Sequence, residues 1–87
     1  MDQPNRLPRL AWLQRLKVYW RMIGPSRKPI TCALYRTPVG LEVRAEHPAG
    51  ELLLVERVET EVAAETYAAA WRAMVKAQGH FTSLDIE

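Results

Sequence analysis

The 87-residue sequence contains few of the residues that form catalytic, metal-binding or disulfide-bonded sites. It has one cysteine, Cys32, two histidines and four glycines. One cysteine cannot close a disulfide within the chain, so we expect a reducing, cytoplasmic location. The glycines fall in turns or at the ends of expected elements, and no glycine-rich phosphate loop or Gly-x-Ser-x-Gly motif is present. We therefore expect no enzyme, no cofactor and no small-molecule substrate.

The only possible nucleophile pair or metal set consists of Cys32, His47 and His80, and its spacing matches no known ligand pattern. A cysteine in a strand next to the carboxylate of Glu46 is more simply a small apolar residue, because a neighbouring negative charge disfavours the thiolate. We expect no metal site.

The sequence also lacks any apolar run of 18 residues, so no membrane-spanning helix is expected. Hydrophobic residues make up 48% of the chain and charged residues 25%, which is typical of a soluble globular domain. At this length the chain has room for one core, and residues 1–87 are expected to form one domain.

Charge is distributed unevenly along the chain. Residues 1–36 carry eight basic side chains and one acidic, whereas residues 37–87 carry four basic and nine acidic. A basic half indicates either an anionic partner or attraction between the two halves of the fold.

The N-terminal segment, residues 1–24, predicts an amphipathic basic helix. Apolar residues recur at helical spacing within about 120° of the helix circumference: Trp12, Leu13, Leu16, Tyr19, Trp20 and Ile23. Gly24 and Pro25 would end this helix, and residues 25–29 would form a short stiff linker.

From Ile30 the apolar period changes to two, and two x-Pro-x-Gly turns follow at 37–40 and 47–50. They predict an antiparallel three-stranded meander over about 30–37, 41–47 and 51–58 with three-residue loops. That loop length puts one set of side chains on an apolar face: Ala33, Tyr35, Leu41, Val43, Ala45, Leu53 and Val55. The other face would mix Cys32, Leu34, Leu52 and Leu54 with charged residues.

A C-terminal helix is expected from the N-cap Thr60 to a stop at Gly79, and its apolar side would cover the apolar face of the sheet. The sequence therefore predicts an α+β fold of order α-β-β-β-α, with residues 30–87 as the βββα core.

The function expected from this arrangement is that of a small interaction or regulatory protein. It would bind a protein partner or a second copy of itself, as a homodimer, through the N-terminal helix, the mixed sheet face or a sheet edge. The expected contact residues are Trp12, Leu16 and Trp20 as apolar anchors and Arg15, Lys17 and Arg21 as a charged rim. The alternative is binding of nucleic acid or an anionic membrane surface by the same basic helix.

Overall fold

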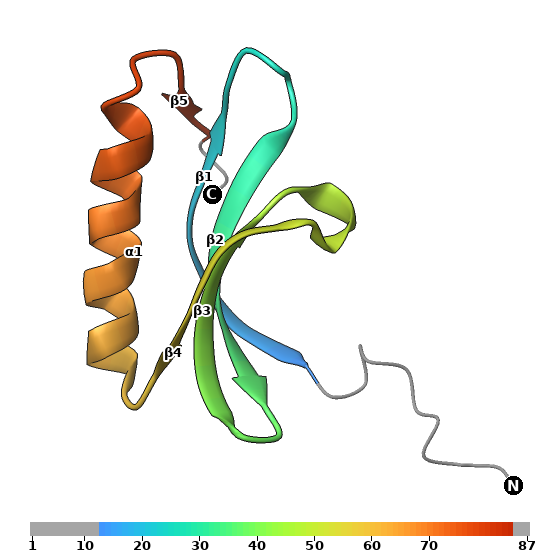
Figure 1. Cartoon of the computed structure of the whole chain (residues 1–87), viewed down its shortest axis with the longest axis vertical. Coiled ribbons are helices and arrows are strands. Elements are labelled where there is room, and N and C mark those ends of the chain that lie inside the picture. Colours follow the sequence, from blue (N-terminus) through green and yellow to red (C-terminus); the bar gives the residue numbers. More distant parts are fainter. Residues whose placement is uncertain (1–12, 85–87) are drawn as a thin grey trace, which may run out of the picture.

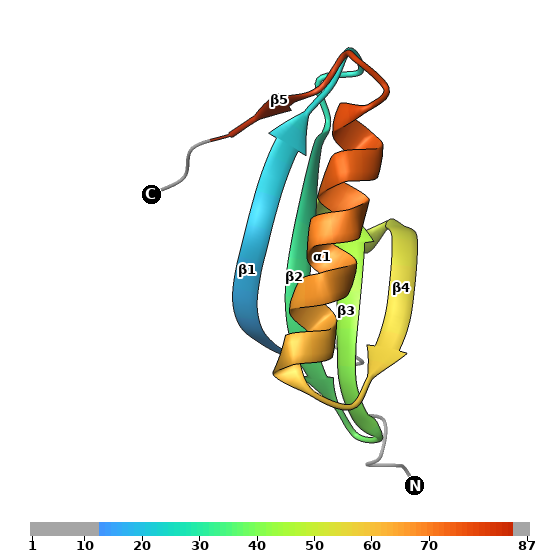
Figure 2. The ribbon, with the colours of Figure 1, turned by 90° about the vertical axis from the view of Figure 1, so that its left-hand side faces the viewer.

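The structure, a computed structural model, describes residues 13–84, which form a five-stranded antiparallel sheet with one α-helix against one face (Figure 1). The strands are β1 (Gln14–Ile23), β2 (Pro29–Thr37), β3 (Gly40–Glu46), β4 (Leu52–Val58) and β5 (Thr82–Ser83). A short 3-10 helix, η3 (Pro48–Gly50), connects β3 to β4, and α1 (Glu61–Lys76) follows β4. The strand order is β4-β3-β2-β1-β5, so β4 and β5 are the edge strands (Figure 2). The predicted α+β class, meander and C-terminal helix are confirmed.

The predicted N-terminal helix is wrong for the described residues, because residues 14–23 form strand β1. Residues 1–12 of that prediction lie outside the described part of the chain. Val18, Tyr19, Trp20 and Ile23 are β-branched or aromatic, and such residues fit a pleated, half-buried strand. The expected linker at 25–29 is the hairpin loop between β1 and β2, and Pro29 already belongs to β2.

Two register shifts in β1 explain why its sequence resembles a helix. They fall between Arg15 and Lys17 and between Val18 and Trp20. Each shift inserts an extra residue, so that Arg15, Val18 and Arg21 pair with Tyr35, Ala33 and Thr31, which alternate along β2. Residues of one face therefore recur every three positions in β1, close to the spacing of a helix.

The predicted hairpin registers are displaced by one residue. Thr37 pairs with Gly40, so the first loop has two residues instead of three, and Val43 pairs with Leu34 and with Glu56. Because side chains alternate between the two faces of a sheet, a one-residue slip changes which side chains share a face. Cys32 and Leu34 consequently lie with Val43 and Ala45 in the core, whereas Ala33 and Tyr35 lie on the opposite face.

The core occupies the space between the sheet and α1. Its buried side chains come from all four long strands and from the helix, and are Trp20, Met22, Ile30, Cys32, Leu34, Val43, Ala45, Val58, Ala64, Ala68 and Val75. We refer to the sheet face away from α1 as the open face.

The beginning of α1 is fixed as the sequence predicts. The Thr60 side chain accepts a hydrogen bond from the backbone N–H of Ala63 at 3.0 Å. Gly79 follows the helix with a φ of 82°, a conformation that favours glycine. The chain then returns to the sheet, where Leu84 N–H donates to the Arg21 carbonyl at 2.9 Å.

Replacement of the fully buried Leu34 by alanine is expected to lower the free energy of unfolding by about 2–5 kcal/mol, because lost burial and the residual cavity add. Urea denaturation measures the change. Val62 on α1 is 70% exposed, and Val62→Ala should stay within about 0.5 kcal/mol of the parent chain. Equal losses for both variants would contradict this placement of the core.

Gly24 is expected to be intolerant of a side chain. A Cβ at this position would overlap the ring of Phe81, which follows α1. Gly24→Ala should therefore cost about 1–3 kcal/mol of stability. The same substitution in a Phe81→Ala background should cost clearly less, because the obstructing ring is gone. Additive effects in this double-mutant cycle would show that the two residues are not in contact.

Candidate functional site

The structure describes five of the six residues predicted to contact a partner, and it separates them. Trp12 lies outside the described residues, and Leu16 is partly exposed on β1. Trp20 is buried against α1, where its indole N–H donates to the carbonyl of Ala68 at 2.8 Å. A buried tryptophan with a satisfied N–H holds the core together, so Trp20 is unavailable as an anchor for a partner.

The three basic residues of the predicted rim divide between the two sides of the sheet. Lys17 reaches toward α1, with its Nζ 3.8 Å from a carboxylate oxygen of Glu65 and 5.6 Å from the centre of the Tyr19 ring. Arg15 and Arg21 extend over the open face, in line with Tyr35 and Thr31. No continuous basic surface of Arg15, Lys17 and Arg21 is formed.

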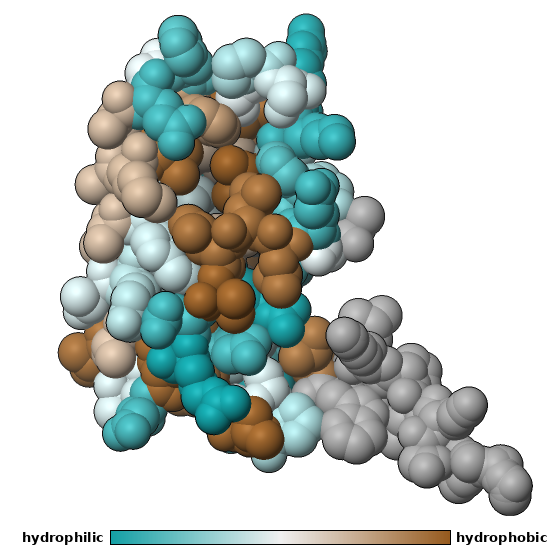
Figure 3. Space-filling view, viewed as in Figure 1, coloured by the Kyte–Doolittle hydropathy of each residue, from teal (hydrophilic) through white to brown (hydrophobic). Residues whose placement is uncertain are grey.

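An exposed apolar surface lies along β4. Leu52, Leu53 and Val55 expose 44%, 42% and 44% of their surface, and Met74 on α1 exposes 47%. In the space-filling view, apolar side chains gather over β4 in the middle of the molecule (Figure 3). We call Leu52, Leu53, Leu54, Val55 and Met74 the β4 patch. Exposed apolar patches of this kind are typical of interaction sites.

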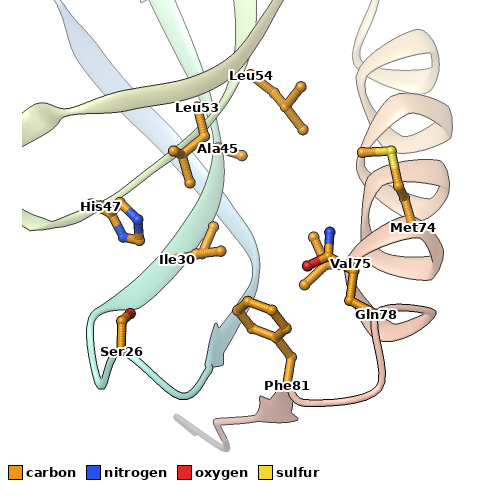
Figure 4. A pocket seen from close by; sticks show the side chains of 10 residues that line it. All are labelled: Ser26, Ile30, Ala45, His47, Leu53, Leu54, Met74, Val75, Gln78 and Phe81. Atoms are coloured by element: carbon orange, nitrogen blue, oxygen red, sulfur yellow. The ribbon is translucent and has the colours of Figure 1, made fainter.

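An apolar cavity of about 380 Å³ opens beside the β4 patch, between the sheet and the C-terminal half of α1. Leu53 and Leu54 face Met74 and Val75 across it, and Phe81 forms its base (Figure 4). Ser26, His47 and Gln78 supply polar groups to the lining. A cavity with apolar walls and a few polar groups is suited to an apolar side chain whose backbone needs hydrogen bonds.

A register shift in the β3–β4 ladder creates this arrangement. Ala45 pairs with Leu54 and Glu46 pairs with Leu52, so Leu53 has no partner in β3. The extra residue directs both Leu53 and Leu54 to the cavity (Figure 4). Sequence reasoning missed the cavity, although the run Leu52–Val55 is a usable signal, since four successive apolar residues cannot all face the core of a sheet covered on one side.

The open face carries a chain of polar contacts. Arg44 Nε donates to Glu42 Oε1 at 3.0 Å, Arg44 Nη1 lies 4.0 Å from Glu46 Oε1, and the Tyr35 hydroxyl donates to Glu46 Oε2. Burial raises the pKa of Tyr35, the hydrogen bond to Glu46 and the charge of Glu46 add to this, and Arg15 acts in the opposite direction. Arg15 pairs with Tyr35 across the β1–β2 ladder.

Cys32 lies in the core, paired with Ala45 and Trp20, and not next to Glu46 as the predicted register had it. Burial raises the pKa of its thiol to about 12, so it is protonated at neutral pH. His47 is engaged elsewhere, with Nδ1 3.1 Å from the Pro29 carbonyl. Since a carbonyl only accepts, this nitrogen carries the proton.

No three histidine, cysteine, aspartate or glutamate side chains within residues 13–84 are grouped so that they could hold a metal ion. Over the same range, no helix combines the length and the apolarity that crossing a membrane requires. Comparison of the chain with models of protein families, with curated proteins and with solved structures gave no match.

The buried thiol predicts a loss of stability at alkaline pH. A folded-state pKa near 12, above the ordinary 9.0, favours the fold while the thiol is protonated, and this contribution is lost as the pH rises from 9 toward 12. At pH 10 the loss is about 1 kcal/mol. Urea denaturation at pH 8 and pH 10 measures how far the free energy of unfolding falls between these two pH values. The fall should be smaller for Cys32→Ala than for the parent chain by that amount. The same drop in both chains would contradict burial of the thiol.

Proposed function

We propose that this protein is a non-enzymatic interaction module that binds an extended apolar segment of a partner protein at the β4 patch. The observation that carries the proposal is the combination of an apolar edge strand with an adjoining apolar cavity. One side chain of the bound segment would occupy the cavity between Leu53 and Met74. The neighbouring residues of the segment would cover Leu52 and Val55.

The position of β4 in the sheet supports binding of an extended segment. It has a strand neighbour, β3, on one side only, so the backbone groups along its other side have no partner in the sheet. Edge strands of this kind accept a further strand from another chain. The strand also lacks proline and lysine, two residues that commonly protect sheet edges.

The charges around β4 specify the partner further. Glu51, Glu56 and Glu59 are exposed along this strand and its ends, and Arg57 is the one basic residue among them. A segment with basic residues flanking its apolar positions would be attracted to this edge and oriented on it. A second copy of the chain would bring the same acidic residues into opposition, so we favour a different protein as the partner over the homodimer.

The alternative function, binding of nucleic acid or an anionic membrane by a basic helix, has less support. It requires Arg15, Lys17 and Arg21 on one helix, whereas residues 14–23 form a strand and Lys17 faces α1.

Selection of phage-displayed peptides on the purified chain tests the proposed function. We expect enrichment of segments with apolar residues between basic ones. When a selected peptide is added, the amide chemical shifts of the protein measured by nuclear magnetic resonance should change in β4 and in the C-terminal half of α1. Leu53→Lys should weaken binding at least tenfold, because it places a charge at the mouth of the cavity.

Val62→Lys is the matched control, since Val62 is an exposed valine at the other end of α1, and it should change affinity by less than twofold. A peptide selection that yields no consensus sequence, or amide shift changes centred on the open face, would refute the proposal. Light scattering over a range of protein concentrations tests for the homodimer. Dimerisation of the parent chain that is lost in Leu53→Lys would identify a second copy of the chain as the partner.

A further inference from the structure

A second, polar cavity of about 210 Å³ lies on the open face, at the end of the sheet where η3 begins. Arg15 and Arg21 of β1 line it together with Thr31 of β2 and His47, and Pro29, Glu46, Pro48 and Gly50 complete its wall. It therefore combines two of the basic residues that the sequence singles out with hydrogen-bonding groups from two other segments.

Arg15 and Arg21 differ from Arg44 in their ion pairs. Arg44 binds Glu42 and lies within salt-bridge distance of Glu46. Within residues 13–84, no carboxylate oxygen lies within 4.0 Å of a guanidinium nitrogen of Arg15 or Arg21. The one carboxylate in the lining, Glu46, accepts a hydrogen bond from the Tyr35 hydroxyl and lies 4.0 Å from Arg44 Nη1, and two guanidinium groups face it in the lining. The cavity thus has an excess of positive charge.

Hydrogen bonds within the cavity leave donors available to a ligand. Arg21 Nε donates to Thr31 Oγ1 at 3.1 Å, which orients the guanidinium and leaves its two terminal NH₂ groups unused by that bond. Because Thr31 Oγ1 is the acceptor, its own hydroxyl proton is still free to donate. Arg15, which also lines the cavity, supplies a second guanidinium.

We propose that this cavity binds the phosphate group of a small molecule. Donors from two strands, β1 and β2, are available to the oxygens of a phosphate, and arginine can donate two parallel hydrogen bonds to them. This site lies on the sheet face opposite the core, and the proposal rests on other observations than the function proposed for the β4 patch. It also departs from the expectation that the protein has no small-molecule ligand.

Titration with inorganic phosphate and with glycerol phosphate, followed by nuclear magnetic resonance at constant ionic strength, tests the site. Saturable shifts are expected at Thr31, His47 and Gly50, and acetate at the same concentration should bind at least fivefold more weakly. Arg15→Gln and Arg21→Gln should each weaken phosphate binding at least tenfold. Two variants are used so that the result does not depend on one hydrogen bond to Thr31.

Arg57→Gln is the matched control. It removes the same charge from the open face at a residue that does not line the cavity, and it should change affinity by less than twofold. An equal loss in Arg57→Gln, or shifts that do not saturate, would overturn the proposal by showing only general attraction of anions. Binding of a DNA oligonucleotide or of phosphatidic acid vesicles without binding of either small phosphate would overturn it in favour of a macromolecular anion.

Discussion

The close contact between α1 and the sheet is the constraint on which the other features depend. The helix turns Ala64 and Ala68 toward the strands, and such small side chains allow its backbone to approach the sheet. The Trp20 indole fills the remaining space and donates to the carbonyl of Ala68 at 2.8 Å. This hydrogen bond joins the helix backbone to β1 and fixes the position of α1 along the sheet.

One helix is too narrow to cover this sheet. An α-helix with its side chains is about 10–12 Å wide, and neighbouring strands are about 4.8 Å apart, so a helix covers two to three strands. The sheet has five. Strand β4 consequently contributes Val58 to the core at one end and leaves Leu53 exposed beside Met74 toward the other. Leu52 and Val55 pair with Glu46 and Arg44 and are exposed on the open face, which the helix does not cover. The cavity side of the apolar surface proposed to bind a partner is thus a consequence of pairing a wide sheet with a single helix.

Local chemistry in the sequence was sufficient to predict α1 and the strands β2, β3 and β4. The Thr60 cap, the Gly79 stop and the two x-Pro-x-Gly turns each depend on neighbouring residues. Strand β1 could not be recognised in this way, because its two register shifts space Arg15, Val18 and Arg21 at intervals of three. The hairpin register depends on whether a loop has two or three residues, and Pro38 and Val39 are compatible with both.

The same limits apply to the sites. A free sheet edge was predicted, but the cavity at Leu53 and the polar cavity that Arg15 and Arg21 share with Thr31 and Glu46 arise from pairing of segments distant in the sequence.

The two cavities differ in chemistry and lie on different sides of the sheet, yet His47 lines both. Its ring is held by the hydrogen bond from Nδ1 to the Pro29 carbonyl, at the start of β2. A ligand that moved this imidazole on one side would change the shape of the other cavity. Thermodynamic linkage makes such an effect reciprocal, so occupancy of either cavity would alter the affinity of the other by the same factor. His47 is therefore the residue at which a change of shape in one cavity would directly reach the other.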